Sequence, residues 1–204
     1  NIQVDALAAK EIAKLFVEVV IAPDFSGEAL TVFSTKPDIR LLKLPDMKEK
    51  SLTGFDIKRV AGGVLLQDWD TRSVDIRPLE AVTKREPTAK EIEGLEFAWK
   101  VAKHVKSNAI VYALMDRTAG VGMGQTSRVY AARAGAINAT EPLSGSVVAS
   151  DGFFPFRDII DNIKRMGVTA VVQPGGSVND KEVIAAADEH DIAMLFTNTR
   201  HFKH

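Results

Sequence analysis

Short apolar stretches alternate with helix-type patterns through the C-terminal 117 residues, and this alternation most constrains the fold. Thr88 and Glu91 have the spacing of a capping box, which predicts a helix over residues 88–104. The later segments predict strands at 108–114, 147–149, 168–173 and 192–196, with helices at 157–166 and 179–190. Such an order predicts an α/β/α arrangement around a mostly parallel sheet.

The first 87 residues show the same rhythm in a shorter form. The pattern predicts helices over 5–16 and 26–33 and strands over 17–22 and 39–44. Residues 55–60 and 64–68 flank Ala61-Gly62-Gly63 and predict a hairpin, which follows a polar, turn-rich stretch at 45–54. We therefore expect two domains: residues 1–87, an incomplete first lobe with a linker at 69–87, and residues 88–204, a second lobe. The incomplete lobe should expose apolar surface where upstream strands would pack.

Composition restricts the class of protein. The chain has 204 residues, a net charge of −1 and no cysteine. The near-neutral charge gives no reason to expect nucleic acid or a membrane surface as a partner. The absence of a long apolar stretch and of a signal-peptide pattern favours a cytoplasmic protein. Thiol chemistry is excluded, and no histidine or carboxylate spacing indicates a catalytic zinc.

Residues 150–158 form an aromatic motif, Ser-Asp-Gly-Phe-Phe-Pro-Phe-Arg-Asp. Pro155 removes a backbone donor and disfavours helical angles at Phe154, so the stretch predicts a loop that leads into a helix near Arg157. The phenylalanines could plug the core. Alternatively, they could form a slot for a flat heterocycle, with Asp158 holding the N–H groups of the ring.

Two glycine-rich turns follow predicted strands, at residues 122–125 (Gly-Met-Gly-Gln) and 173–177 (Gln-Pro-Gly-Gly-Ser). Glycines at such turns let a ligand approach the backbone, although neither turn is a complete dinucleotide fingerprint. The turns and the aromatic loop should meet at one sheet edge and form a cleft. The tail at 200–204 (Arg-His-Phe-Lys-His) could be a solvated basic segment. Because Phe202 would be poorly placed in a free tail, the sequence favours a docked tail.

These motifs, together with residues 106–110 (Lys-Ser-Asn-Ala-Ile) and 122–128, resemble the C-terminal part of the transformylase domain of the bifunctional AICAR transformylase/IMP cyclohydrolase family. The resemblance implies two cytidine-deaminase-like α/β/α lobes without zinc and a homodimer with active sites at the subunit interface. It also implies transfer of a formyl group from 10-formyltetrahydrofolate to AICAR ribotide in purine (IMP) biosynthesis. In that family a second domain, which this sequence lacks, closes the product to IMP.

The resemblance also assigns roles to individual residues. The implied catalytic residues are Asn108, near the transferred formyl group, and the terminal His204. The implied ribotide-binding residues are Arg200, Phe202 and Glu18, with Arg200 as a phosphate fork. The implied folate-binding residues are Phe153, Pro155, Phe156, Asp158, Val129 and Ser177. Ser107 and Asp151 are implied as contributors to a potassium site.

One departure from the family pattern bears on activity. The family's catalytic Lys-His pair lies upstream of this sequence, and Lys103-His104 does not correspond to it. One expectation is therefore a piece of a longer enzyme, with little turnover of its own. The other is a non-catalytic ligand-binding or dimerisation module on the same fold.

Overall fold

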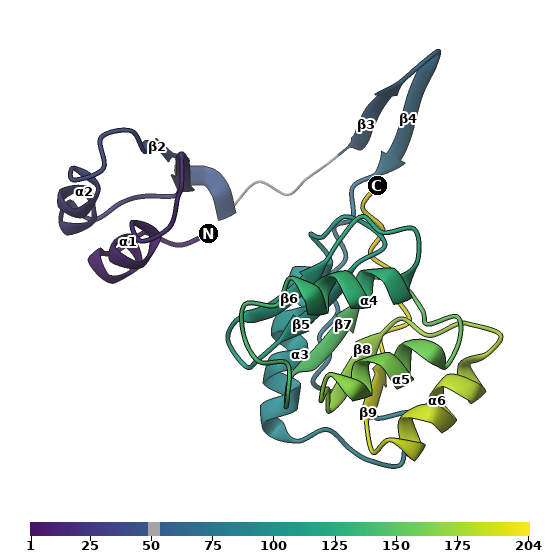
Figure 1. Ribbon diagram of the computed structural model, residues 1–204. Helices are drawn as coiled ribbons and strands as arrows, with labels where there is room; N and C mark the ends of the chain where they lie inside the picture. Colours follow the sequence, from purple (N-terminus) through teal and green to yellow (C-terminus); the bar gives the residue numbers. More distant parts are fainter. Residues whose placement is uncertain (49–53) are drawn as a thin grey trace. The chain divides into compact units, whose positions relative to one another are not determined.

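The computed structural model describes residues 1–48 and 54–204, which divide into two compact units, 1–71 and 72–204 (Figure 1). The first unit contains α1 (Ala6–Ile12), β1 (Val19–Ala22), α2 (Gly27–Phe33), β2 (Arg40–Lys43) and a 3-10 helix (Pro45–Lys48). Asp5 and Ser26 cap the two α-helices by accepting backbone N–H groups. The strands pair in parallel, so the expected β-α-β unit is present.

The first unit has a small core and a large apolar surface. Ala9, Val20, Ala29 and Phe33 form the buried cluster between the helices and one face of the strands. Val19 and Ile21 alternate with the buried residues of β1 and are 44% and 52% exposed. Helix α1 ends at Ile12 rather than at residue 16, and Phe16 is 94% exposed.

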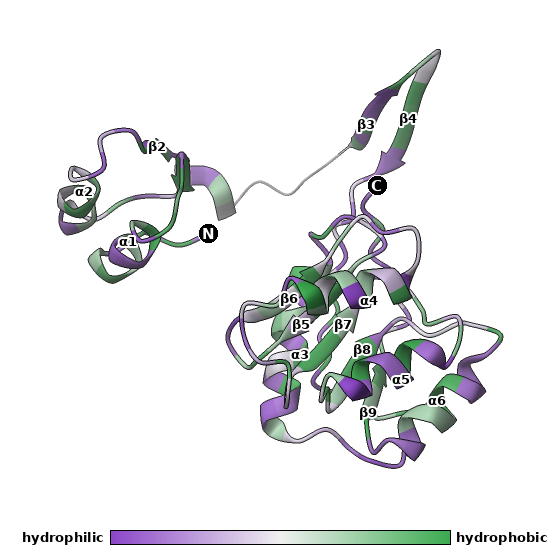
Figure 2. Cartoon of the chain, in the orientation of Figure 1, coloured by the Kyte–Doolittle hydropathy of each residue, from purple (hydrophilic) through white to green (hydrophobic). Residues whose placement is uncertain are grey.

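The predicted hairpin consists of β3 (Phe55–Val60) and β4 (Gly63–Asp68), paired antiparallel. The register pairs Ile57 with Leu66 and Arg59 with Val64, so alternate residues lie on one face. Figure 2 shows the apolar character of β4, and its leucines are more than half exposed. Of the polar stretch predicted at 45–54, residues 49–53 lie outside the described residues.

The second unit is built on one five-stranded sheet. Its strands are β5 (Ile110–Ala113), β6 (Thr118–Gly122), β7 (Val147–Ser150), β8 (Ala170–Gln173) and β9 (Ala193–Phe196), in the order β6-β5-β7-β8-β9. Strands β7, β8 and β9 are parallel, while β5 is antiparallel to both of its neighbours. The sheet is therefore mixed rather than mostly parallel. The four-residue connection between β5 and β6 is too short for a crossover and allows only an antiparallel pair.

Helices cover both faces of this sheet, which confirms the α/β class. Helix α3 (Ala89–Ala102) packs on one face, where Leu95 and Ala98 meet Val111 and Ala149. Helices α4 (Arg128–Ile137), α5 (Asp158–Arg165) and α6 (Asp180–Glu189) cover the other face around a second cluster. Among the described helices, none combines the length and apolar composition required to cross a membrane.

The segment at 72–87, expected to be a linker, is packed structure of the second unit. Ile76 is fully buried in the α3 cluster. The backbone N–H of Val82 donates to the carbonyl of Met194 at 2.9 Å, and Ala81 forms an antiparallel bridge with Leu195. The boundary between the units consequently lies at residues 71–72. Pro78 and the surrounding charged residues are typical of a linker, so the sequence pattern did not indicate that this segment packs against the core.

A partly buried ion pair connects the segment at 72–87 to α3. The Arg85 guanidinium donates to both carboxylate oxygens of Glu91, at 2.8 and 3.0 Å, and also to the carbonyl of Thr169. Burial alone would raise the pKa of Glu91, but hydrogen bonds from Arg85, Thr169 and Thr88 outweigh it and lower the pKa to about 2. Thr88 and Glu91 also form the predicted capping box.

The depressed pKa of Glu91 predicts a loss of stability in acid. Because the folded-state pKa lies below the ordinary value of 4.5, the stabilisation is complete above about pH 4.5 and declines as the pH falls towards 2. We expect Glu91→Gln to unfold at a lower temperature than the parent chain at pH 6, with the difference shrinking at pH 3. Thermal melts across this range test it, with the exposed Glu93→Gln on the same helix as control. A difference that stays constant with pH would contradict the assignment.

Candidate functional site

Five chain segments converge at one edge of the second unit's sheet (Figure 1). Because β5 runs antiparallel to β6 and β7, it begins at the edge where β6, β7, β8 and β9 end. This edge therefore carries both glycine-rich turns, the aromatic loop, the C-terminal tail and the segment before β5. Loops at strand ends are the usual ligand sites of open α/β sheets. The predicted convergence of the turns and the aromatic loop is confirmed.

The three phenylalanines of the aromatic loop have different environments. Phe154 is fully buried in the core, so it plugs the core. Phe153 is partly buried, and the Arg200 guanidinium lies 4.9 Å from its ring centroid. Phe156 is 57% exposed. The core interpretation is therefore confirmed for Phe154, while the heterocycle slot stays a prediction for Phe153 and Phe156. Asp158 follows as the exposed first residue of α5.

Gln173 joins the aromatic loop to the second glycine-rich turn. Its side-chain oxygen accepts the backbone N–H groups of Phe154 at 3.3 Å and Gly175 at 3.0 Å. Asn179 adds a second link by donating to the carbonyl of Pro155 at 2.8 Å, and its own backbone N–H donates to Ser177 Oγ. Sequence reasoning missed the role of Gln173. A polar residue that ends an otherwise apolar strand was the available signal.

The first glycine-rich turn serves packing as well as access. A Cβ at Gly122 would overlap the carbonyl oxygen of Ala131, and one at Gly120 would overlap that of Gly135. Only glycines at these strand positions let α4 lie so close to β6. Gly124, in contrast, has a φ of +64°, which the turn itself requires.

A buried ion pair joins the start of the aromatic loop to α4. Arg128, the first residue of α4, donates to Asp151 Oδ1 at 3.1 Å, and the Asp151 side chain is completely buried. Burial lowers the pKa of Arg128, although the Asp151 charge opposes this shift. A Cβ at Gly152 would overlap the Arg128 guanidinium, so this glycine makes room for the pair. Sequence reasoning named the neighbouring Val129, which packs against the core, and missed Arg128.

The C-terminal tail is docked, as predicted, but through a different residue. Phe202 is 40% exposed, whereas His201 is 1% exposed and its ring lies 4.7 Å from that of Trp99. The His201 backbone N–H donates to the Asp151 carbonyl at 3.0 Å. Ser107 and Lys203 exchange two further hydrogen bonds of 2.8 and 3.0 Å. The Phe202 ring lies beside Arg128 and Arg200, at 6.0 Å from each.

Asn108 and His204 lie at the start of β5 and at the end of the tail. The Asn108 side-chain amide donates to the carbonyl of Gln125 at 2.9 Å, which ties it to the first glycine-rich turn. That contact directs the amide towards this turn. One amide hydrogen and the side-chain oxygen remain for other partners. His204 is exposed, with its ring 5.8 Å from that of Phe202.

Asp151 and Ser107, the residues expected at a potassium site, both form hydrogen bonds with the docked tail. Asp151 Oδ2 is buried and has no hydrogen-bond partner among the described residues, although the Arg128 guanidinium contacts the other oxygen. Ser107 Oγ accepts the backbone N–H of Lys203 at 3.0 Å. Hard cations prefer oxygen ligands of these kinds. The described residues contain no group of three or more histidine and carboxylate side chains of metal-site type.

Glu18 belongs to the first unit and is described separately. It is exposed and precedes β1, and its carbonyl accepts the backbone N–H of Arg40 at 2.9 Å. With Phe16 and Asp38 it lines a cavity of about 430 Å³.

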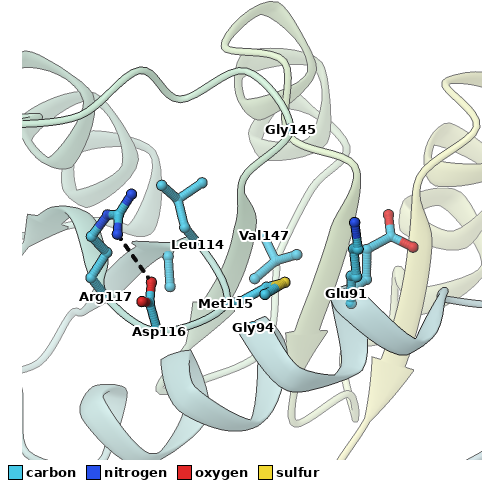
Figure 3. Close-up of a pocket in the computed structure, with 10 residues that line it drawn as sticks. Glu91, Gly94, Leu114, Met115, Asp116, Arg117, Gly145 and Val147 are labelled. Carbon is cyan, nitrogen blue, oxygen red and sulfur yellow. Dashed lines mark hydrogen bonds and ion pairs between the residues drawn. The ribbon is translucent and has the colours of Figure 1, made fainter.

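A further cavity of about 430 Å³ opens at the opposite edge of the second unit's sheet (Figure 3). It lies where β5 ends and β7 begins, beside the first turns of α3. Gly94 and Val147 contribute to its apolar wall, and Asp116 and Arg117 form an ion pair beside it. None of the residues expected in the site lines this cavity.

The fold and site define an α/β unit with aromatic and cationic side chains at the strand ends. The sequence profile of the AICARFT/IMPCHase bienzyme family matches residues 1–138. The chain is also 52% identical, over 98% of its length, to the "Bifunctional purine biosynthesis protein PurH" of Magnetococcus marinus. The chain belongs to the AICARFT/IMPCHase bienzyme family, and it spans about 40% of the length of that relative.

A solved structure described as "Structural genomics, protein ybgI, unknown function" also aligns with the chain. The TM-score is 0.23 at 17% sequence identity, with 98% of this chain and 71% of that chain covered.

Proposed function

We propose that this chain is part of a longer enzyme of purine biosynthesis that transfers a formyl group from 10-formyltetrahydrofolate to AICAR ribotide. The observation that carries this proposal is the 52% identity to a bifunctional purine biosynthesis protein over almost the whole chain. The convergence of Asn108, Arg200 and the aromatic loop at one sheet edge supports it. The longer enzyme would also carry the IMP cyclohydrolase activity.

The ribotide is proposed to bind beside the docked tail. Arg200 is exposed, and no carboxylate among the described residues pairs with it, so its guanidinium fork is available to a phosphate. The Phe153 and Phe202 rings flank this guanidinium and would hold it in place. Glu18, a residue of the first unit, is proposed as a further ribotide-binding residue.

Reduced folate is proposed to bind along the aromatic loop. Phe153 and the exposed Phe156 would supply apolar contact to the pterin, together with Pro155 and Val129. The exposed Asp158 carboxylate can accept N–H groups, and the Ser177 hydroxyl lies on the turn that Asn179 links to this loop. The two hydrogen bonds that the Gln173 side chain accepts would keep the aromatic loop and the second glycine-rich turn in one arrangement as the ligand binds.

The proposed reaction needs positioning, an oxyanion donor and proton transfer. A weakly nucleophilic aromatic amine attacks the formyl carbon, and negative charge develops on the formyl oxygen. The bond between that carbon and N10 of the folate then breaks, as the amine loses a proton and N10 gains one. Asn108 would donate one amide hydrogen to that oxygen, while its other amide hydrogen stays bonded to the carbonyl of Gln125. His204 would assist proton movement near the ribotide. Ser107 and Asp151 would hold a potassium ion.

The longer enzyme is proposed to be a cytoplasmic homodimer with cytidine-deaminase-like lobes. The apolar surface of the first unit supports packing against further structure, since Ile21, Leu42 and Phe16 are each more than half exposed. The chain alone would then lack turnover, because the family's Lys-His pair is not among its residues. A non-catalytic binding or dimerisation module is the alternative, and it would bind ligands without supporting transfer in any assembly.

Substitution of Asp158 tests the folate assignment. We expect Asp158→Asn to weaken binding of tetrahydrofolate by about 1.5–3 kcal/mol, the range for a hydrogen bond to a charged group. Binding of AICAR ribotide should change much less. Titration calorimetry measures both, with Asp116→Asn at the opposite sheet edge as control. Equal loss of both ligands would contradict the assignment.

A further inference from the structure

The docked tail contains an anchor that the proposed catalytic roles do not use. Exposure alternates along it, because Arg200 and Phe202 are exposed while His201 between them is 1% exposed. The backbone hydrogen bonds to Asp151 and Ser107 fix the path of the tail. They set the register of the tail, and the ring contacts show which side of it faces α3.

The contact between His201 and Trp99 shows which side of the tail faces α3. Trp99 lies on α3 in the cluster that covers one face of the sheet, and it is 3% exposed. The two ring centroids are 4.7 Å apart with the planes inclined by 53°. Because His201 is buried against this ring, the side chains before and after it are directed away from α3.

The consequence is visible at Arg200. Its guanidinium lies 4.9 Å from the Phe153 centroid and 6.0 Å from that of Phe202. A tail that rotated by one residue would bury a guanidinium beside Trp99 and remove it from the aromatic loop, at a large desolvation cost. The burial of His201 therefore favours the arrangement that presents Arg200 to the site.

We propose that His201, packed against Trp99, is a positioning residue that fixes the tail so that Arg200 and Phe202 face the aromatic loop. The link to ribotide binding rests on the proposed function. The packing itself does not, so the two can be tested separately.

Fluorescence reports the packing without any ligand. The sequence has two tryptophans, so a Trp69→Phe background leaves Trp99 as the sole emitter. His201→Ala should make Trp99 more accessible to acrylamide and speed trypsin cleavage after Arg200. His201→Leu, which replaces the imidazole with an apolar side chain of similar size, should restore protection. His190→Gln, which removes a partner of Asp161 on the surface, serves as control.

Binding then tests the positioning. We expect His201→Ala to lower the affinity for AICAR ribotide about tenfold, a change of ~1.4 kcal/mol. Arg200→Ala should lower it at least as much, and His201→Leu should retain most of it. Calorimetry on the complete chain supplies the values. An unchanged affinity in His201→Ala, with Trp99 exposed, would overturn the positioning role.

The outcomes also separate this inference from the proposed function. If the parent chain binds no ribotide, the ribotide assignment fails, and the positioning role is decided by trypsin cleavage after Arg200. If His201→Ala changes neither Trp99 accessibility nor cleavage, the anchor is overturned, whatever the chain binds.

Discussion

Replacement of Arg128 by methionine is expected to lower the free energy of unfolding by about 3–5 kcal/mol, the cost of leaving a buried charge without its partner. The Asp151 side chain is completely buried and its Oδ2 already lacks a hydrogen-bond partner among the described residues. Loss of the guanidinium would remove the contact to Oδ1 as well. The carboxylate would then face the apolar interior alone.

A double-mutant cycle isolates the pair from the loss of packing. Asp151→Asn combined with Arg128→Met should be clearly more stable than the sum of the single changes predicts, because neither charge is then left uncompensated. Urea denaturation of the four chains gives the coupling free energy.

The chain supplies a matched control of the same residue types. Asp116 and Arg117 form a pair of 3.3 Å in which the side chains are 73% and 56% exposed. The cycle with Asp116→Asn and Arg117→Met should give a coupling below about 1 kcal/mol. Additive effects at Arg128 and Asp151 would show that burial does not strengthen this pair.

The α/β class was predictable because strand and helix periods are local properties of the sequence. The capping box at Thr88 and Glu91 and the hairpin around Gly62 were predictable for the same reason. The sequence did not predict that β5 runs antiparallel to its neighbours. That direction depends on the short connection between β5 and β6, which permits only an antiparallel pair. The packing of residues 72–87 was also missed, because its contacts with β9 join residues over 100 positions apart.

The site was predictable as a set of motifs but not as a set of contacts. The loops at the strand ends carry glycine and aromatic signals that the sequence displays directly. Gln173 and Arg128 carry no such signal, and only the folded chain shows that each joins two segments. The tail shows the same limit: hydrophobicity indicated Phe202 as its anchor, whereas a partner on α3 makes His201 the buried residue.

The remaining prediction concerns Asn108 in the longer enzyme proposed above. Asn108→Ala is expected to lower the rate of formyl transfer by about 10²–10³-fold, the usual cost of losing one oxyanion donor. Affinities for AICAR ribotide and reduced folate should change little, because the hydrogen bond strengthens only as charge develops on the formyl oxygen. Steady-state kinetics and calorimetry on the same preparations separate the two effects.

Two variants sharpen this test. Asn108→Asp keeps the shape of the side chain but replaces the donor by a carboxylate, so its rate should fall at least as far. Asn138→Ala, at the exposed end of α4, should retain the parent rate. Residues 1–204 alone, with Asn108 intact, should show almost no transfer, since the family's Lys-His pair is not among them. Robust formylation of AICAR ribotide by this chain alone would contradict both that dependence and the proposal that the chain acts only within a longer enzyme.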